Sequence, residues 1–122
     1  MRDEIRRVAC DDPILDGVRN AETDMSSDIW VGLWDGEPVI VWGIIPRCLL
    51  SEDAFVWSFT WPAVHKCKKT FLRRTREMVK ELHKTYPTLY GLCSRHTRWL
   101  DHLGAVYTST FDNYHVFVIR HV

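Results

Sequence analysis

The fold is decided by the stretch Ala54-Phe-Val-Trp-Ser-Phe-Thr-Trp61, the segment 62–85 after it, and Leu89-Tyr-Gly-Leu-Cys93. Aromatic residues alternate with smaller ones along 54–61, which is the period of a β-strand, so the aromatic side chains share one face. Apolar residues recur at helical spacing along 62–85, which predicts a long amphipathic helix, and we expect this helix to cover the aromatic face. A strand, a helix and a strand in this order predict a βαβ crossover with the two strands parallel.

The residues before this stretch predict a β-hairpin. Two runs of branched and aromatic residues, 29–34 and 38–45, flank the dipeptide Asp35-Gly36. This dipeptide suits the positive φ angles of a tight turn, and Pro46 ends the second run. The first 28 residues predict one or two short helices joined at Asp11-Asp12-Pro13, where Asp12 can cap a helix that begins at Pro13.

The C-terminal residues predict a short helix and a second hairpin. We expect Ser94 to cap a helix that runs to Leu103 and is ended by Gly104. Strands are expected over 105–110 and 114–122, on either side of a turn at Asp112-Asn113.

Together these segments predict a single α+β domain over 1–122, with a mixed sheet of about six strands flanked by helices. Its parts are short N-terminal helices at 1–28, a hairpin and third strand at 29–61, a helix-strand-helix segment at 62–104, and a C-terminal hairpin at 105–122.

The composition fits a globular chain and excludes several other classes. Of 122 residues, 46% are apolar and 26% charged, and 16 basic residues balance 16 acidic ones. That balance is neither disordered nor collagen-like. The longest apolar run, Val39–Ile45, is far shorter than the ~20 residues of a membrane-spanning helix. Charged residues at the N-terminus argue against a secretory signal, so we expect the protein in the cytoplasm.

The charges are unevenly distributed along the chain. Residues 1–61 hold 5 basic and 12 acidic residues, whereas residues 62–86 hold 8 basic and 2 acidic ones. Five of the basic residues recur every three or four positions and form a stripe on the predicted helix. They are Lys66, Lys69, Arg73, Arg76 and Lys80. The stripe is either a solvated face or a local site for an anion.

The cysteines and histidines predict no metal site. The four cysteines are far apart, form no C-x-x-C pair, and are interpreted as free thiols. They are Cys10, Cys48, Cys67 and Cys93. The closest pair of potential ligands, His65 and Cys67, lies two residues apart on a predicted helix, where the side chains do not face each other.

The C-terminal half resembles one protein family. Arg98-Trp-Leu-Asp-His-Leu-Gly-Ala-Val106 is similar to the segment that runs into the sixth strand of the GNAT N-acetyltransferases, and the order of expected elements over residues 29–122 resembles theirs. More narrowly, four segments are similar to a GNAT-like internal virion protein of short-tailed bacteriophages. They are Lys69-x-Phe71, Lys84–Tyr90, His96–Val106 and Tyr114–Ile119.

The resemblance implies a site for acetyl-CoA or CoA and departs from the family at three places. The cofactor-binding residues that it implies are Phe59, Trp61, Lys66, Cys67, Lys68, Lys69, Arg73 and Cys93. The family's glycine-rich pyrophosphate loop falls on 61–69, which contains no glycine, so lysines would have to supply the charge. Cys93 stands where the family often has Asn, and Leu100 stands where it has the Tyr that protonates the leaving thiolate.

No catalytic residue is assigned from the sequence. The strand 55–61 contains no carboxylate base, and three carboxylates near strand ends are open alternatives. They are Glu37, Glu52 and Asp53. Tyr107 and Tyr114 are alternative acids, although packing is the commoner role of a strand tyrosine.

Three functions follow as alternatives. The departures favour a phage protein that keeps the fold and acts in virion morphogenesis, in the internal core or in genome ejection, with a virion or host protein as its partner. It would lie in the host cytoplasm or in the virion. The second function is an active acetyltransferase that modifies a host protein or a small amine. Binding of nucleic acid is least favoured, because no aromatic residues interleave with the basic stripe.

Overall fold

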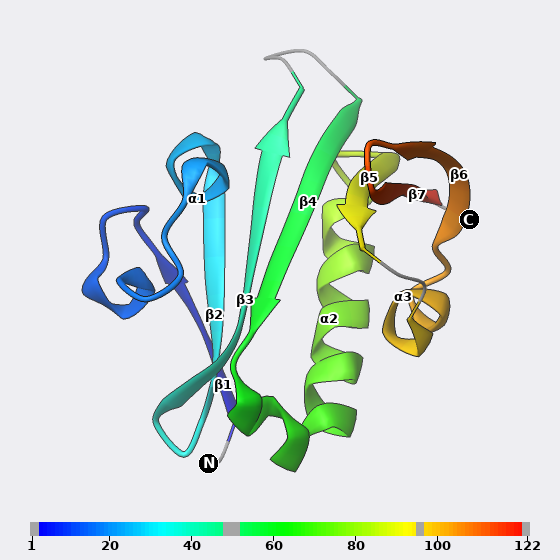
Figure 1. Ribbon diagram of the computed structural model, residues 1–122. Helices are drawn as coiled ribbons and strands as arrows, with labels where there is room; N and C mark the ends of the chain where they lie inside the picture. Colours follow the sequence, from blue (N-terminus) through cyan, green and yellow to red (C-terminus); the bar gives the residue numbers. More distant parts are fainter. Residues whose placement is uncertain (1–2, 48–51, 95–96, 121–122) are drawn as a thin grey trace. The chain divides into compact units, whose positions relative to one another are not determined.

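The computed structural model describes residues 3–47, 52–94 and 97–120, and its strands form a seven-stranded mixed sheet in the order β1-β2-β3-β4-β5-β7-β6 (Figure 1). The strands are β1 (Asp3–Val8), β2 (Asp28–Trp34), β3 (Glu37–Pro46), β4 (Asp53–Thr60), β5 (Thr88–Cys93), β6 (Val106–Phe111) and β7 (Tyr114–Arg120). The helices are η1 (Pro13–Leu15), α1 (Ala21–Met25), η2 (Pro62–Lys66), α2 (Lys68–Leu82) and α3 (Arg98–His102). The predicted α+β class is confirmed.

The chain divides into two compact units, which are described one after the other. The first unit comprises residues 1–45 and 57–71, and the second comprises residues 46–56 and 72–122. Strand β4 and helix α2 contribute residues to both units. That the chain is a single domain stays a prediction.

In the first unit, β2 and β3 form the predicted hairpin. Val31 pairs with Val41, and the two strands run antiparallel. At the turn, Asp35 has a φ of 51° and Gly36 a φ of 84°. Two successive positive φ angles match the right-handed twist of the flanking strands, and glycine adopts such an angle without a steric cost. The hairpin prediction is confirmed.

The prediction of one or two short helices within residues 1–28 is wrong for residues 3–8, and residues 1 and 2 lie outside the described residues. Residues Asp3–Val8 form β1, which pairs antiparallel with β2 and places Ile5 opposite Gly32. The two apolar residues of this segment, Ile5 and Val8, are three apart, which fits one face of a helix as well as a strand. Pairing with β2 satisfies the backbone groups and overrides that local pattern. This strand is the seventh, beyond the six expected.

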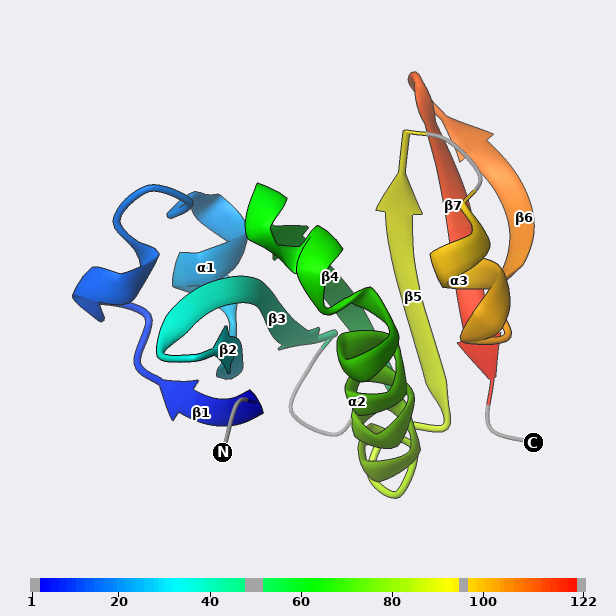
Figure 2. The ribbon, with the colours of Figure 1, turned by 90° about the horizontal axis from the view of Figure 1, so that it is seen from below.

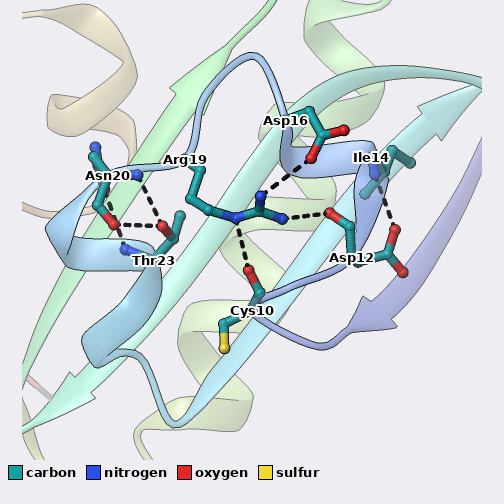
Figure 3. Close-up of polar contacts among 7 residues, drawn as sticks. All are labelled: Cys10, Asp12, Ile14, Asp16, Arg19, Asn20 and Thr23. Carbon is teal, nitrogen blue, oxygen red and sulfur yellow. Dashed lines mark hydrogen bonds and ion pairs between the residues drawn. The ribbon is translucent and has the colours of Figure 1, made fainter.

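The rest of the N-terminal segment is held by local polar contacts (Figure 3). The side chain of Asp12 accepts a hydrogen bond of 2.9 Å from the Ile14 amide, so the predicted cap before Pro13 is confirmed, on a 3₁₀ helix. Arg19 donates to the Cys10 carbonyl at 3.1 Å and to the Asp12 carbonyl at 2.9 Å. The same guanidinium pairs with Asp16 at 3.1 Å. These bonds, together with the burial of Leu15, fix the connection between β1 and α1.

One face of β2 and β3 packs against this N-terminal segment. Leu15, Ile29, Val31, Leu33 and Val41 form a buried cluster, and Trp57 and Trp61 pack against it. Trp57 reaches this face because Gly43 leaves room for it: a Cβ at Gly43 would lie 2.1 Å from the indole ring. The indole Nε1 donates a hydrogen bond of 2.7 Å to the Ser26 hydroxyl.

The opposite face of β2 and β3 receives the start of α2. Phe71 is fully buried and contacts Trp34 and Trp42, with ring centroids 6.5 and 6.3 Å away. A Cβ at Gly32 would lie 2.5 Å from the Phe71 ring. The sequence predicted that the long helix covers the aromatic face of residues 54–61, most of which form β4. In this unit that prediction is wrong. Trp57 and Phe71 lie on opposite faces, and Phe59 remains 45% exposed.

The predicted continuous helix over 62–85 is interrupted. Residues Pro62–Lys66 form a 3₁₀ helix, and the α-helix begins only at Lys68. Between them, Cys67 has φ −138° and ψ 28°, and its amide bonds the Val64 carbonyl, three residues back, at 3.0 Å. The i to i−3 bond belongs to a 3₁₀ turn, so a new helix has to start after it. The α-helix ends at Leu82 rather than at residue 85.

In the second unit, β5 joins two neighbours. It pairs in parallel with β4 over Asp53–Phe55, which confirms the predicted parallel pair, and antiparallel with β7. Figure 2 shows β7 between β5 and β6. The C-terminal hairpin is confirmed over the described residues up to Arg120, with Asp112 at a φ of 56° in the turn. Residues 121 and 122 of the predicted strand lie outside the described residues.

The short helix before this hairpin begins later than predicted. Helix α3 spans Arg98–His102, and its cap is Thr97, whose side chain accepts a hydrogen bond of 3.2 Å from the Leu100 amide. The predicted cap, Ser94, lies outside the helix. Both residues can cap, so the sequence alone did not distinguish between them. Gly104 has a φ of 82°, as expected for the residue that follows the helix.

Candidate functional site

The candidate site lies in the first unit, where η2 passes into α2. A hollow of about 360 Å³ opens at this junction. One lining residue comes from the end of β2, and the other six are successive residues of the junction and the first helical turn. They are Trp34, His65, Lys66, Cys67, Lys68, Lys69 and Thr70. The break at Cys67 creates the site, because it places the beginning of an α-helix inside the hollow.

The position of Trp34 in the lining is set by aromatic packing. Trp34 is the last residue of β2 and is half-buried. It meets Phe71 of the first helical turn at an interplanar angle of 71°. The Phe71 amide donates a hydrogen bond of 3.1 Å to the Cys67 carbonyl. This bond joins the first turn of α2 to the junction. One side chain of the lining, that of Trp34, is therefore held by the core of this unit.

The electrostatics of the hollow favour an anion. Lys66, Lys68 and Lys69 are exposed around it, and His65 adds a ring nitrogen. The first turn of α2 contains no acidic residue. The first amide N–H groups of an α-helix have no partner within the helix and carry a partial positive charge. Amides and ammonium groups at one place form a suitable site for phosphate groups.

The thiol of Cys67 is the buried member of this set. Its side chain is 5% exposed, and its Sγ lies 4.0 Å from the Ala63 carbonyl oxygen. Burial raises the pKa of the Cys67 thiol, and the charge of Lys66 opposes this in part. The thiol is therefore protonated at neutral pH and is a poor nucleophile there.

Four of the eight predicted cofactor residues lie together in this hollow: Lys66, Cys67, Lys68 and Lys69. Two others belong to the same unit but do not line it. Phe59 is on β4 and contacts Trp61 edge-on, with 5.4 Å between ring centroids. The Trp61 amide donates to the Val39 carbonyl at 2.9 Å, and its side chain packs on the Leu15 cluster.

The remaining two predicted residues belong to the second unit. Arg73 pairs with Glu77 at 3.9 Å on α2, one turn further along. Cys93 ends β5, pairs with His115 of β7, and has its Sγ 3.8 Å from the His115 carbonyl oxygen. Their role toward a cofactor stays a prediction.

The residues considered as alternative acids and bases lie outside the hollow. Leu100 lies in α3, and the hydroxyl of Tyr107 accepts a hydrogen bond of 3.4 Å from the amide of the α3 cap, Thr97. Tyr114 is 46% exposed on β7. Among the carboxylates, Asp53 pairs with Arg47 at 3.2 Å. The other two are exposed: Glu37 begins β3, and Glu52 precedes β4. None of these residues lines the hollow.

Three lining residues were missed by the sequence analysis: Trp34, His65 and Thr70. Trp34 is far from residue 66 in the chain, and only its contact with Phe71 brings it there. His65 was considered for a metal, and its place within a run of lysines was the signal for an anion. Over residues 3–47, 52–94 and 97–120, no group of three or more His, Cys, Asp or Glu residues could hold a metal ion.

No helix among the described residues is long and apolar enough to cross a bilayer.

Comparison with known proteins shows which fold surrounds this site. By sequence, the chain matches no family model and no curated protein. By structure, it is similar to an IAA acetyltransferase of Bacillus cereus, with a TM-score of 0.72 and 9% identity over 97% of this chain and 99% of the other. A GNAT family acetyltransferase of Elizabethkingia anophelis with acetyl-CoA bound has a TM-score of 0.67 and 8% identity, over 98% of each chain.

A third similar structure has a higher identity. A putative acetyltransferase of Exiguobacterium has a TM-score of 0.65 and 17% identity, over 95% of this chain and 93% of the other. These likenesses show a shared fold, and they confirm the mixed sheet flanked by helices that the sequence predicted.

Proposed function

We propose that this chain, which has the GNAT fold, binds acetyl-CoA or CoA and transfers the acetyl group to an amine. The observation that carries the proposal is the hollow at the start of α2. Three exposed lysines line it, one just before the helix and two in its first turn. The proposal therefore rests on the chemistry of these residues.

The residues of the hollow fit the pyrophosphate of CoA. Lys66, Lys68 and Lys69 supply positive charge, and the amides at the start of α2 supply hydrogen-bond donors. The junction has no glycine, so the backbone is less open to close approach than in a glycine-rich loop. Flexible lysine side chains reach an anion from a greater distance than amides can, and they offset that difference.

Bound acetyl-CoA would supply an activated acetyl thioester, to which an amine can add. In our proposal this chain's contribution is to bind and orient that group: the lysines hold its phosphates, and Trp34 bounds the hollow beside them. Correct positioning of two reactants can account for a large part of an enzyme's rate enhancement. We assign no residue as the acid or base of the transfer.

The alternative is a protein that keeps the fold without the reaction. It rests on the resemblance to phage internal virion proteins and on Leu100 and Cys93, which stand where the family often carries Tyr and Asn. In that role the chain would act in virion morphogenesis with a virion or host protein as partner. It would then have no need of CoA.

The two proposals differ in whether the hollow binds the pyrophosphate of CoA, and this difference can be measured. Thermal unfolding is followed with acetyl-CoA and, in parallel, with S-acetylpantetheine, which has the same thioester but no pyrophosphate. A ligand that binds the folded state alone raises the midpoint of unfolding. We expect acetyl-CoA to raise it and S-acetylpantetheine to leave it nearly unchanged at equal concentration. Equal shifts would contradict a phosphate site, and no shift with either would favour the scaffold role.

A further inference from the structure

One residue that lines the hollow has a side chain whose charge changes near neutral pH. That residue is His65, because histidine ordinarily gains a proton between pH 8 and pH 5. The lysines of the lining stay charged over this range, and Trp34 and Thr70 stay neutral. Burial raises the pKa of the Cys67 thiol, so this group stays protonated as well.

Among the described residues of the lining, every charged neighbour of His65 is basic. These neighbours are Lys66, Lys68 and Lys69. From β2, the other element that contributes to the lining, the residue that faces the hollow is Trp34. Two carboxylates, Asp35 and Glu37, follow Trp34 in the chain, and neither of them lines the hollow. A proton on His65 would therefore add to the positive charge of the hollow rather than neutralise a carboxylate.

The break in the helix brings His65 beside the start of α2. His65 belongs to η2 and is exposed, and the α-helix begins three residues later. The first i to i−4 bond of α2 runs from the Phe71 amide to the Cys67 carbonyl. The amides of residues 68–70 precede this bond, so they have no partner within the helix. A protonated histidine donates from both ring nitrogens and would add two donors to these amides.

Proton binding and phosphate binding at this place favour each other. A phosphate group attracts an imidazolium, whereas a neutral imidazole offers it no charge. Hydrogen bonds between charged partners are also about twice as strong as neutral ones. A ligand that prefers the protonated form binds more tightly when the proton is present, and it takes up a proton as it binds.

We propose that His65 binds the phosphate groups of the ligand as an imidazolium, so that the hollow holds them more tightly at pH 6 than at pH 8. The inference rests on the proposed function, because it takes the pyrophosphate of CoA as the ligand of the hollow. It adds a binding residue to the three lysines. It also makes release of the ligand depend on pH, since the charge of His65 is lost as the pH rises.

The ligand for the test is 3′-dephospho-CoA. CoA itself carries a 3′-phosphate monoester, and a monoester loses its second proton near pH 6. The charge of CoA would therefore change over the same range as that of a histidine. The pyrophosphate of 3′-dephospho-CoA is a diester that keeps its charge between pH 6 and pH 8. Any change in affinity over this range then comes from the protein.

Calorimetric titration at equal ionic strength measures the affinity at the two pH values. We expect the parent chain to bind 3′-dephospho-CoA at least about fivefold more tightly at pH 6 than at pH 8. His65→Gln keeps a polar side chain that does not titrate, so its two affinities should agree within about twofold. His65→Lys keeps a charge at both pH values, and should bind at both as tightly as the parent does at pH 6, within about threefold.

His102→Gln is the matched control. His102 is an exposed histidine at the end of α3, in the second unit, and it does not line the hollow. This variant should keep the fivefold difference of the parent chain. Heats measured at pH 7 in two buffers with different enthalpies of ionisation give a second readout. The parent chain should take up part of a proton on binding, and His65→Gln should take up none.

The outcomes separate this inference from the proposed function. Equal affinities of the parent chain at pH 6 and pH 8 overturn the inference and leave the proposed function standing. A pH dependence that survives in His65→Gln overturns the inference too, because another group then carries it. The absence of binding at both pH values overturns the proposed function and the inference together.

Discussion

Trp34, the last residue of β2, meets Phe71, in the first turn of α2, edge to face with 6.5 Å between their ring centroids. Trp34 lines the hollow, whereas Phe71 is fully buried beneath it. This pair joins the core of the first unit to the lysines of the candidate site. The stability of the core and the shape of the site therefore depend on the same aromatic contact.

Phe71→Ala tests that dependence. The substitution removes a fully buried ring from between Trp34 and Trp42, and we expect the free energy of unfolding to fall by about 3–5 kcal/mol. Phe59→Ala is the control, since Phe59 is 45% exposed and its removal should cost less than about 2 kcal/mol. Urea unfolding followed by tryptophan fluorescence measures both. Equal losses would contradict the packing described for Phe71.

Gly43→Ala tests the face that carries Trp57. A Cβ at residue 43 would lie 2.1 Å from the indole ring, so the ring has to move, and we expect a loss of about 1–3 kcal/mol. The hydrogen bond from Trp57 to Ser26 should be lost with it. Gly17→Ala is the matched control, because a Cβ there meets nothing within 4 Å. The same unfolding experiment should find it within about 1 kcal/mol of the parent chain.

Charge reversal in the hollow tests the ligand site. The double change Lys66→Glu and Lys69→Glu should weaken acetyl-CoA binding at least about tenfold at low ionic strength, and less near 0.15 M salt, where exposed charges are screened. Lys80→Glu makes the same kind of change in the last turn of α2, outside the hollow, and should leave affinity nearly unchanged. Titration at two salt concentrations gives the comparison. A loss independent of salt would count against an electrostatic contact.

Cys67 offers a chemical probe of the same place. Burial raises the pKa of the Cys67 thiol and shields it from reagents, whereas Cys10 is exposed. We expect iodoacetamide to modify Cys10 first, as measured by mass spectrometry of peptides. Bound acetyl-CoA should slow Cys67 further without protecting Cys10. Faster reaction at Cys67 than at Cys10 would contradict its burial.

The same pKa shift has a consequence for stability. The unfolded chain loses the Cys67 proton at a lower pH than the folded chain, because the folded pKa is raised. The contribution of this group is therefore present below the ordinary thiol pKa of about 8.5 and is lost as pH rises above it. Cys67→Ser should flatten the fall in the free energy of unfolding over that alkaline range.

Much of the fold could be predicted from local sequence signals. Asp35-Gly36 defined the hairpin of β2 and β3, and the strand-helix-strand order around α2 predicted the parallel pairing of β4 and β5. What failed depended on distant partners. Strand β1 forms because β2 offers it hydrogen bonds, and Trp57 turns to the Leu15 cluster because Gly43 leaves room there. Neither partner is visible in the local pattern.

The candidate site also contains residues that local sequence predicts and one that depends on a distant contact. Lys66, Cys67, Lys68 and Lys69 are four successive residues, and the sequence alone indicated them. Trp34 enters the hollow through a contact between residues far apart in the chain. The break at Cys67 also escaped prediction, because apolar and basic residues keep a helical spacing across it. Local spacing reports which side chains can share a face, but it does not report whether the backbone stays helical.

Calorimetric titration of the purified chain with acetyl-CoA, at physiological ionic strength, tests the central claim most directly. The account predicts saturable heat, with one site per chain and a dissociation constant in the micromolar range, about −8 kcal/mol. It also predicts that inorganic pyrophosphate competes for the same site, because the lysines recognise the phosphates. The absence of any heat would contradict the claim and leave the hollow as a basic surface of a protein that has kept only the fold.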